Sequence, residues 1–105
     1  MCSMGNELRL EKHLIVLLER KGIFNFKGNP TNLKGFPDRL VFADKIYFVE
    51  LKVGKLDGSR YGQTAMQRWW QRKITQANGH YILLKGMREI DEWVESLPDL
   101  STKQN

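Results

Sequence analysis

Three charged residues lie in or beside two strongly apolar segments of the chain. Asp38 follows Pro37 directly before the first segment, which runs from 39 to 42. Glu50 and Lys52 lie near the end of the second segment, which runs from 46 to 53. Burying such charges among β-branched and aromatic residues costs free energy unless they contact one another or a metal ion. Two carboxylates and a lysine are the groups that a Mg²⁺-dependent phosphodiesterase needs. The sequence therefore predicts a catalytic site at Asp38, Glu50 and Lys52.

The connection between the two segments decides whether the carboxylates meet. We expect the segments to be the two strands of a hairpin, joined by the loop 43–45. Glu50 and Lys52 must share a face because side chains alternate along a strand. A three-residue loop places Asp38 opposite Glu50, whereas a two-residue loop places the acids on opposite faces. The catalytic prediction therefore requires the three-residue loop.

With that register, the carboxylates of Asp38 and Glu50 and the backbone carbonyl of Leu51 are candidate ligands of one hard cation. Mg²⁺ or Mn²⁺ suits an all-oxygen site whose remaining positions hold water and phosphate. The metal would activate a bound water and stabilise the leaving oxygen, and Lys52 would hold that water or balance charge in the transition state. A structural alternative stays open, in which Glu50 and Lys52 form a cross-strand pair and Asp38 caps a turn.

Hydrophobic periodicity predicts the elements that position these residues. Helices are expected over 7–21, 64–78 and 89–97, and two further strands over 23–27 and 80–84. The expected apolar stripe of the first helix is Leu8, Leu14, Ile15 and Leu18, and that of the second is Met66, Trp70, Ile74 and Ala77. Gly22 and Gly79 are expected just after the ends of these helices. The order α-β-β-β-α-β-α predicts an α/β protein of the α+β kind, with helices packed on a mixed sheet.

Length and composition restrict the class of protein. The 105 residues suffice for a single domain, 1–105, with a core of about 7–97. A net charge of +5 favours a polyanionic partner, nucleic acid before an anionic membrane. The one cysteine, Cys2, excludes a disulfide framework and indicates a reducing, intracellular location. The longest apolar run, 14–18, is too short to cross a membrane.

Three motifs occur in order along the chain: Gly35-x-Pro37-Asp38, Glu50-Leu51-Lys52 and, in the predicted second helix, Gln67-Arg68-Trp69. Together they resemble the PD-(D/E)xK nucleases, and more narrowly the VRR-NUC family. The resemblance spans roughly 7–84, and the family has the α-β-β-β-α-β core predicted above. It implies a restriction-endonuclease-like fold and a DNA endonuclease that depends on Mg²⁺ or Mn²⁺. A D…ExK pattern alone is common by chance, whereas the full ordered set is fairly specific.

The resemblance adds two candidate residues. Glu11 lies on the apolar stripe of the first helix, where the family implies a metal ligand or a water-bridged acid. The alternative is a boundary glutamate that reaches solvent. Gln67 matches a family glutamine that supports Lys52 and the water or phosphate beside the metal, but Thr64-x-x-Gln67 is also a capping-box pattern. Arg39 also matches the family, but strand alternation turns it away from Asp38 and favours a structural role.

Basic residues and one tyrosine are candidates for DNA contact. We expect phosphate contacts that position the duplex without reading its bases, and stacking of the tyrosine on a base. Each basic residue taken alone is equally explained as part of a solvated surface. The candidates are Lys34, Lys55, Arg60, Tyr61, Arg68, Arg72 and Lys73.

A single small domain leaves no separate module for sequence recognition, so we expect recognition of DNA shape. Standalone VRR-NUC proteins resemble junction-resolving enzymes, which implies branched substrates such as Holliday junctions and a role in DNA repair or recombination. Paired cuts across a junction need two active sites, which predicts a homodimer. We expect the cytoplasm of a bacterium or of a phage-infected host, with no membrane partner. The alternatives are a flap or 5′ nuclease, a restriction-type endonuclease, and a non-catalytic DNA-binding domain.

Overall fold

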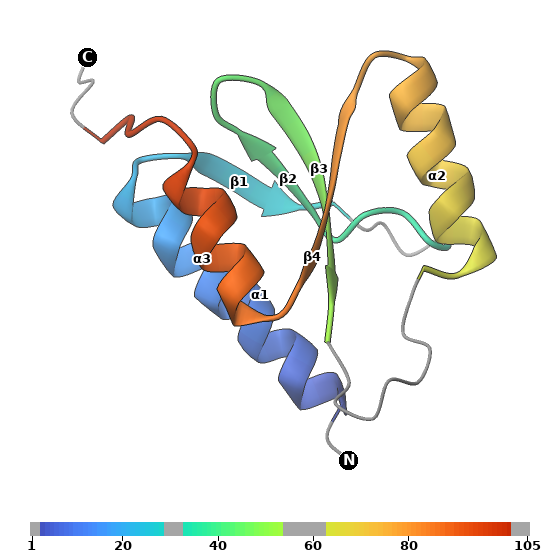
Figure 1. The fold of residues 1–105 in the computed structure, drawn as a ribbon, viewed down its shortest axis with the longest axis horizontal. Coiled ribbons are helices and arrows are strands. Elements are labelled where there is room, and N and C mark those ends of the chain that lie inside the picture. Colours follow the sequence, from blue (N-terminus) through green and yellow to red (C-terminus); the bar gives the residue numbers. More distant parts are fainter. Residues whose placement is uncertain (1–2, 29–32, 54–62, 102–105) are drawn as a thin grey trace.

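The computed structural model describes residues 3–28, 33–53 and 63–101. The elements in chain order are α1 (Ser3–Arg20), β1 (Phe24–Lys27), β2 (Arg39–Phe42), β3 (Ile46–Lys52), α2 (Ala65–Gln76), β4 (His80–Lys85) and α3 (Met87–Glu95). This order confirms the predicted α-β-β-β-α-β-α arrangement around a mixed sheet. Figure 1 shows α1 and α3 side by side against one side of the sheet, with α2 on the other.

The sheet has the strand order β1-β2-β3-β4. The first three strands are antiparallel, and β4 pairs in parallel with β3 after the crossover through α2. Phe42 pairs with Ile46 and Arg39 with Val49, so the connection between β2 and β3 has three residues. One further step along this ladder places Asp38 opposite Glu50. The register that the catalytic prediction required is therefore present.

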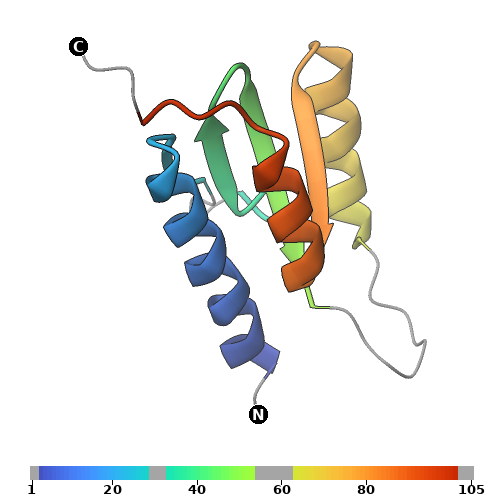
Figure 2. The same ribbon diagram turned by 60° about the vertical axis from the view of Figure 1, so that its left-hand side comes forward.

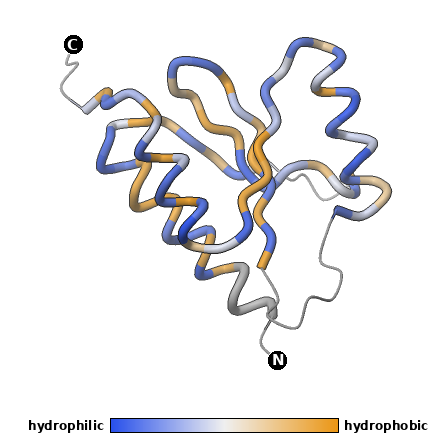
Figure 3. Tube along the Cα trace, viewed as in Figure 1, coloured by the Kyte–Doolittle hydropathy of each residue, from blue (hydrophilic) through white to orange (hydrophobic). Residues whose placement is uncertain are grey.

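The hydrophobic core lies between α1, α3 and the face of the sheet that they cover. Every second residue of the strands points to this face, as strand alternation demands. Figure 3 shows hydrophobic stretches concentrated on the central strands. The buried apolar side chains of this layer are Leu10, Leu14, Leu18, Ile23, Val41, Val49, Leu51, Leu84, Ile90, Val94 and Leu97.

The buried stripe of α1 differs from the predicted one. Leu10, Leu14 and Leu18 are buried, whereas Leu8 is exposed and Ile15 is half-buried. At about 100° per residue, Leu8 lies roughly 120° around the helix from Leu14, so the two cannot face the same core. Like the other described helices, α1 is not long and apolar enough to cross a membrane.

The helix α2 covers only one edge of its face of the sheet. Its backbone comes close to β4 alone among the described strands, although the Gln67 side chain extends to Glu50 on β3, and Figure 2 shows the helix behind β4. Met66, which the sequence placed on the apolar stripe of this helix, is exposed as a result. The half of this face that β1 and β2 form has no described helix over it.

The predicted helix ends are confirmed in one case and shifted by a residue in the other. Gly22 follows α1 with a φ of 68°, the left-handed conformation that ends many helices. After α2 it is Asn78, not Gly79, that takes this conformation, with a φ of 67°. Asparagine tolerates it better than most residues. Gly79 is required for another reason, because a Cβ there would lie 2.6 Å from the side chain of Ile74.

Candidate active site

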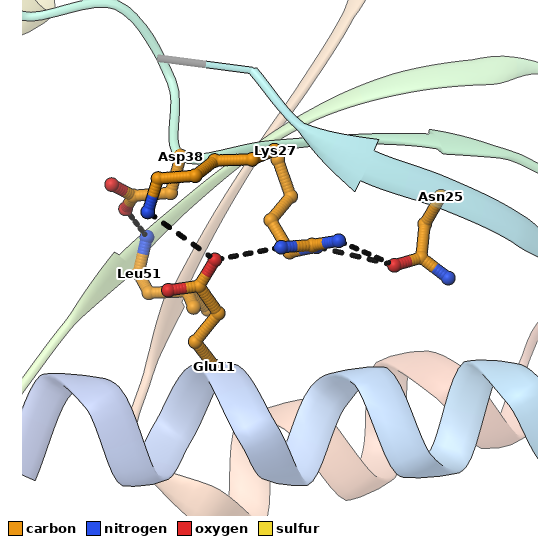
Figure 4. A network of polar contacts seen from close by, with 6 residues as sticks. Glu11, Asn25, Lys27, Asp38 and Leu51 are labelled. Carbon is orange, nitrogen blue, oxygen red and sulfur yellow. Dashed lines mark hydrogen bonds and ion pairs between the residues drawn. The ribbon is translucent and has the colours of Figure 1, made fainter.

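Asp38, Glu50 and Lys52 lie on the face of the sheet that α2 partly covers. Glu50 and Lys52 are two residues apart on β3, and the β2–β3 register places Asp38 beside them. Asp38 Oδ2 accepts a hydrogen bond from the backbone N–H of Leu51 at 2.8 Å (Figure 4). Asp38 thus binds the backbone of the neighbouring strand, within the Glu50-Leu51-Lys52 motif itself. The bond holds one carboxylate beside the other.

The Gly35-x-Pro37-Asp38 segment brings this strand end against the start of α2. Gly35 has a φ of 81°, and a Cβ there would lie 2.7 Å from Cβ of Met66 and 3.1 Å from the backbone nitrogen of Gln67. Any other residue would push the loop away from the helix. Pro37 is fully buried and fixes the chain just before Asp38. The motif therefore sets the position of Asp38 relative to α2.

Gln67 combines the two roles that the sequence left open. The capping box of α2 is present: the Gln67 side-chain Oε1 accepts from the Thr64 backbone N–H at 2.9 Å, and Thr64 Oγ1 accepts from the Gln67 backbone N–H at 3.1 Å. The same carboxamide donates from Nε2 to Oε2 of Glu50 at 2.6 Å. Because the cap uses the oxygen of the amide, the NH₂ group turns toward Glu50. The helix cap and the orientation of the carboxylate are thus one interaction system.

Tyr81 on β4 lies at the same site and was not among the predicted residues. It pairs with Phe48, so it shares the face of Glu50, and its Oη accepts a hydrogen bond from Gln63 Nε2 at 2.9 Å. Gln63 Nε2 also donates to Gln71 Oε1 of α2 at 2.9 Å. Burial raises the pKa of Tyr81 to about 12. The hydrogen bond from Gln63 opposes this rise in pKa, and the negative charges of Glu50 and Asp38 add to it. The phenol therefore stays protonated beside the two carboxylates.

Glu11 rises from α1 toward the sheet, where it lies beside Lys27 (Figure 4). Its Oε2 is 2.7 Å from Nη1 of the buried Arg39 and 4.0 Å from Nζ of Lys27. Arg39 also donates from Nε and Nη2 to Oδ1 of Asn25, at 3.2 and 2.9 Å. The alternation of β2 turns Arg39 toward α1 and away from Asp38, as predicted. Glu11 balances the charge of Arg39, and its place in a metal shell stays a prediction.

The donor set fits a hard divalent cation. Within the described residues no three His, Cys, Asp or Glu side chains cluster in a way that could hold a metal ion. The protein ligands would therefore be the carboxylates of Asp38 and Glu50 and the carbonyl oxygen of Leu51. Mg²⁺ is commonly bound through one or two carboxylates, with water and substrate phosphates completing its six positions. The two carboxylates on one face match that pattern.

Four of the seven predicted DNA-binding residues lie in the described part of the chain. Arg68, Arg72 and Lys73 are exposed on α2, and Lys73 Nζ lies 5.5 Å from the ring centre of Trp69. Lys34 is exposed on the loop before β2. Its backbone carbonyl accepts a hydrogen bond from Trp70 Nε1 of α2 at 3.0 Å. These four cations therefore gather on and beside α2. The other three candidates, Lys55, Arg60 and Tyr61, lie outside the described residues.

The chain has the fold of a solved structure named "VRR_NUC domain". The two share 22% sequence identity with a TM-score of 0.71, and the match covers 87% of this chain and 96% of that one. No family model matches the chain, and no curated protein matches it in sequence. The likeness confirms the fold that the motifs predicted.

The raised pKa of Tyr81 predicts a specific loss of stability in alkali. The unfolded chain releases this proton near pH 10 and the folded protein near pH 12. The stabilisation is complete below pH 10 and is lost as the pH rises from 10 through 12, because the unfolded state then gains from ionisation first. We expect the free energy of unfolding, measured by urea denaturation, to fall less steeply over this range in Tyr81→Phe than in the wild type.

Titration of tyrosinate by its ultraviolet absorbance supplies the matching readout. The folded wild type should show one tyrosine that ionises near pH 12, and Tyr81→Phe should lack that component. Identical late titration in the two proteins would contradict the burial of the Tyr81 phenol.

Proposed function

We propose that the protein is a Mg²⁺- or Mn²⁺-dependent endonuclease that hydrolyses phosphodiester bonds in branched DNA, such as Holliday junctions, as a homodimer. One observation carries the proposal. Asp38 and Glu50 face the same side of adjacent strands, each oriented by a hydrogen bond, with Lys52 on the same face. The fold, which is that of a VRR_NUC domain, supports the assignment of this constellation to nuclease chemistry.

Each residue of the site has a role that follows from its place. Asp38 and Glu50 would hold the cation, which when bound polarises the phosphate and lowers the pKa of a water molecule. Lys52 is next to Glu50 along the same strand face, where its ammonium group would orient that water and stabilise the charge on the phosphate oxygens. Gln67 keeps the Glu50 carboxylate in one orientation. A preorganised charge of this kind needs no rearrangement when the substrate binds.

The basic residues on α2 and the loop before β2 support DNA as the substrate. Lys34, Arg68, Arg72 and Lys73 lie on the same side of the sheet as the catalytic candidates, and the whole chain carries a net charge of +5. Such contacts neutralise phosphates and carry no sequence information. Selection by DNA shape is therefore the recognition mode that this surface supports, and two linked sites would allow paired cuts across a junction.

The decisive experiment incubates the full chain with a synthetic four-way junction, a flap and a duplex of equal length, each with Mg²⁺, Mn²⁺ or EDTA. We expect paired cuts in the junction with either metal, and no cleavage in EDTA. Asp38→Asn and Lys52→Met should lower the cleavage rate by about a hundred- to a thousandfold, the effect of losing one preorganised charge, while DNA affinity stays nearly constant. One of the exposed carboxylates of α3 supplies the matched control, Glu92→Gln, which should keep full activity.

Each alternative has its own outcome in this assay. No cleavage of any DNA in Mn²⁺ would reject the nuclease and leave a DNA-binding domain. Preferential cleavage of the flap or of the duplex would retain the nuclease and replace the junction as its substrate.

The dual use of Gln67 gives a second prediction, which separates the helix cap from the site. Thr64→Ala removes the Oγ1 acceptor of the cap but keeps the backbone N–H that orients the Gln67 amide. It should lower the free energy of unfolding by about 1 kcal/mol and leave the cleavage rate almost unchanged. Gln67→Met should lose similar stability and also lose activity by about ten- to a hundredfold, as expected for a group that orients a metal ligand.

Unfolding in urea and initial cleavage rates, measured on both variants, decide between the two roles of Gln67. If Gln67→Met keeps the same cleavage rate as Thr64→Ala, close to that of the wild type, Gln67 acts only as a helix cap.

A further inference from the structure

Trp69 on α2 is a large aromatic side chain that stays partly exposed among cations. It is 39% exposed, and Met66, one turn before it on the helix, is 40% exposed. The neighbouring Arg68, Arg72 and Lys73 are exposed as well. Tryptophan is highly buried on average, so an exposed ring is an informative exception. Aromatic rings among cations are typical of surfaces that bind unpaired nucleic-acid strands.

The Trp69 ring is held in place by its neighbours. It meets the Trp70 ring edge to face, with 5.1 Å between the centroids and an interplanar angle of 89°. Trp70 is itself fixed, because its Nε1 donates to the carbonyl of Lys34 at 3.0 Å and its ring packs edge-on against Phe36 at 4.8 Å. Nζ of Lys73 lies 5.5 Å from the centre of the Trp69 ring, within the range of a cation–π contact. A ring supported in this way binds a flat ligand with little further loss of conformational entropy.

Trp69 lies on the side of α2 that is turned away from β4. At about 100° per residue, Met66, Trp69 and Lys73 lie within about 60° of one another around the helix. Gln71, which is turned toward β4, lies about 160° from Trp69. A Cβ on Gly35, in the loop before β2, would lie 2.7 Å from Cβ of Met66. The side of α2 that carries the exposed ring therefore adjoins the loop that leads to the catalytic candidates.

A groove of about 330 Å³ lies between this side of α2 and the sheet. Its largely apolar wall includes Phe36, Phe48, Trp70, Lys73 and Ile74. Lys73 thus belongs both to the groove and to the cation–π contact with Trp69. Phe48 precedes Glu50 by two residues on β3, which is a rise of about 7 Å along the strand. The ring and the groove therefore lie within about one nucleotide of the proposed site of cleavage.

We propose that the Trp69 ring stacks on a nucleobase that the branch point of the DNA leaves open, and that this contact selects branched DNA over continuous duplex. In a continuous duplex each base is covered on both faces by its neighbours, so a protein ring meets no open base. At a branch point the stack is interrupted, and a base there is unstacked at a lower cost in free energy. The cations beside the ring bind the phosphates of the same strand. This inference rests on the proposed function, because it names the residue that recognises the shape of the proposed substrate.

The test measures the affinity of the full chain for a four-way junction and for a duplex of equal length by fluorescence anisotropy in EDTA, so that no cleavage occurs. We expect Trp69→Ala to weaken junction binding by about ten- to a hundredfold, the loss that accompanies removal of one stacking ring, and to leave duplex binding within about twofold. Trp69→Phe keeps a ring and should restore most of the affinity. Val16 is an exposed apolar residue of α1, on the opposite side of the sheet, and Val16→Ala should bind both DNAs as the wild type does.

Arg72→Gln supplies the contrast with a phosphate contact on the same helix. It should weaken junction and duplex binding alike and reduce the slope of log affinity against log salt concentration by about 1. Trp69→Ala should leave that slope unchanged, because stacking releases no counterions. Far-ultraviolet circular dichroism checks that the variants fold, and Trp69→Leu is the second variant if Trp69→Ala does not.

The inference is overturned if the wild type does not bind the junction more tightly than the duplex, or if Trp69→Ala loses affinity equally for both DNAs or for neither. A change in the mass of Trp69→Ala in solution, measured by sedimentation velocity, would overturn it as well and assign the ring to a contact between subunits. Failure of the proposed function is visible separately, because cleavage is measured with Mg²⁺ added. A chain that selects the junction through Trp69 and cleaves no DNA retains this inference and loses the nuclease. A chain that cleaves the junction equally well in Trp69→Ala retains the nuclease and loses this inference.

Discussion

The burial of the Glu50 carboxylate is the constraint on which the architecture of the site depends. This side chain is 3% exposed within a central strand, where an ionised carboxylate costs several kcal/mol unless hydrogen bonds or an opposite charge compensate it. Gln67 supplies a bond of 2.6 Å from the first turn of α2, so the helix must begin directly above the strand. That approach requires Gly35 in the loop before Asp38, because a side chain there would strike the helix. The three motifs are distant in sequence, but they meet in the fold because all of them take part in accommodating one buried carboxylate.

The adjacent residues Asp38 and Arg39 point to opposite faces of the sheet and have different roles. Arg39 points to α1, where Glu11 and Asn25 satisfy its guanidinium group, and Asp38 points to the opposite face and holds the backbone of Leu51. A slip of one residue in the β2–β3 register would exchange the two faces. It would place Asp38 in the apolar core and expose the partners of Arg39. The three-residue hairpin loop therefore preserves both the ion pair that stabilises the core and the carboxylate pair of the site.

The parts of the site that could be predicted are those that depend on local geometry. Side-chain alternation and the length of one loop were sufficient to place Asp38 opposite Glu50 and to turn Arg39 away. Tyr81 could not be placed in this way, because the parallel register of β3 and β4 is set by the crossover through α2 and by packing. The Thr64-x-x-Gln67 pattern indicated either a helix cap or a site residue. The pattern alone does not show that the oxygen of the Gln67 amide serves the cap while its nitrogen binds Glu50. The exposure of Phe24 and Phe26 also escaped prediction, since alternation assigns a face and not what covers it.

The contact between Gln67 and Glu50 and the exposure of Phe24 and Phe26 have one structural cause. A helix lying across β1 and β2 would bury the phenyl rings, but it would also lie over the strand ends beside Asp38 and Glu50, where the proposed DNA substrate would enter. With α2 displaced to β4, Asp38 is only half-buried and Gln67 still reaches the buried Glu50. The apolar half of the same face then has no described element over it. Exposing this surface to water costs free energy in proportion to its area. The position of one helix thus decides both which carboxylate Gln67 orients and which half of the sheet face stays uncovered by the described elements.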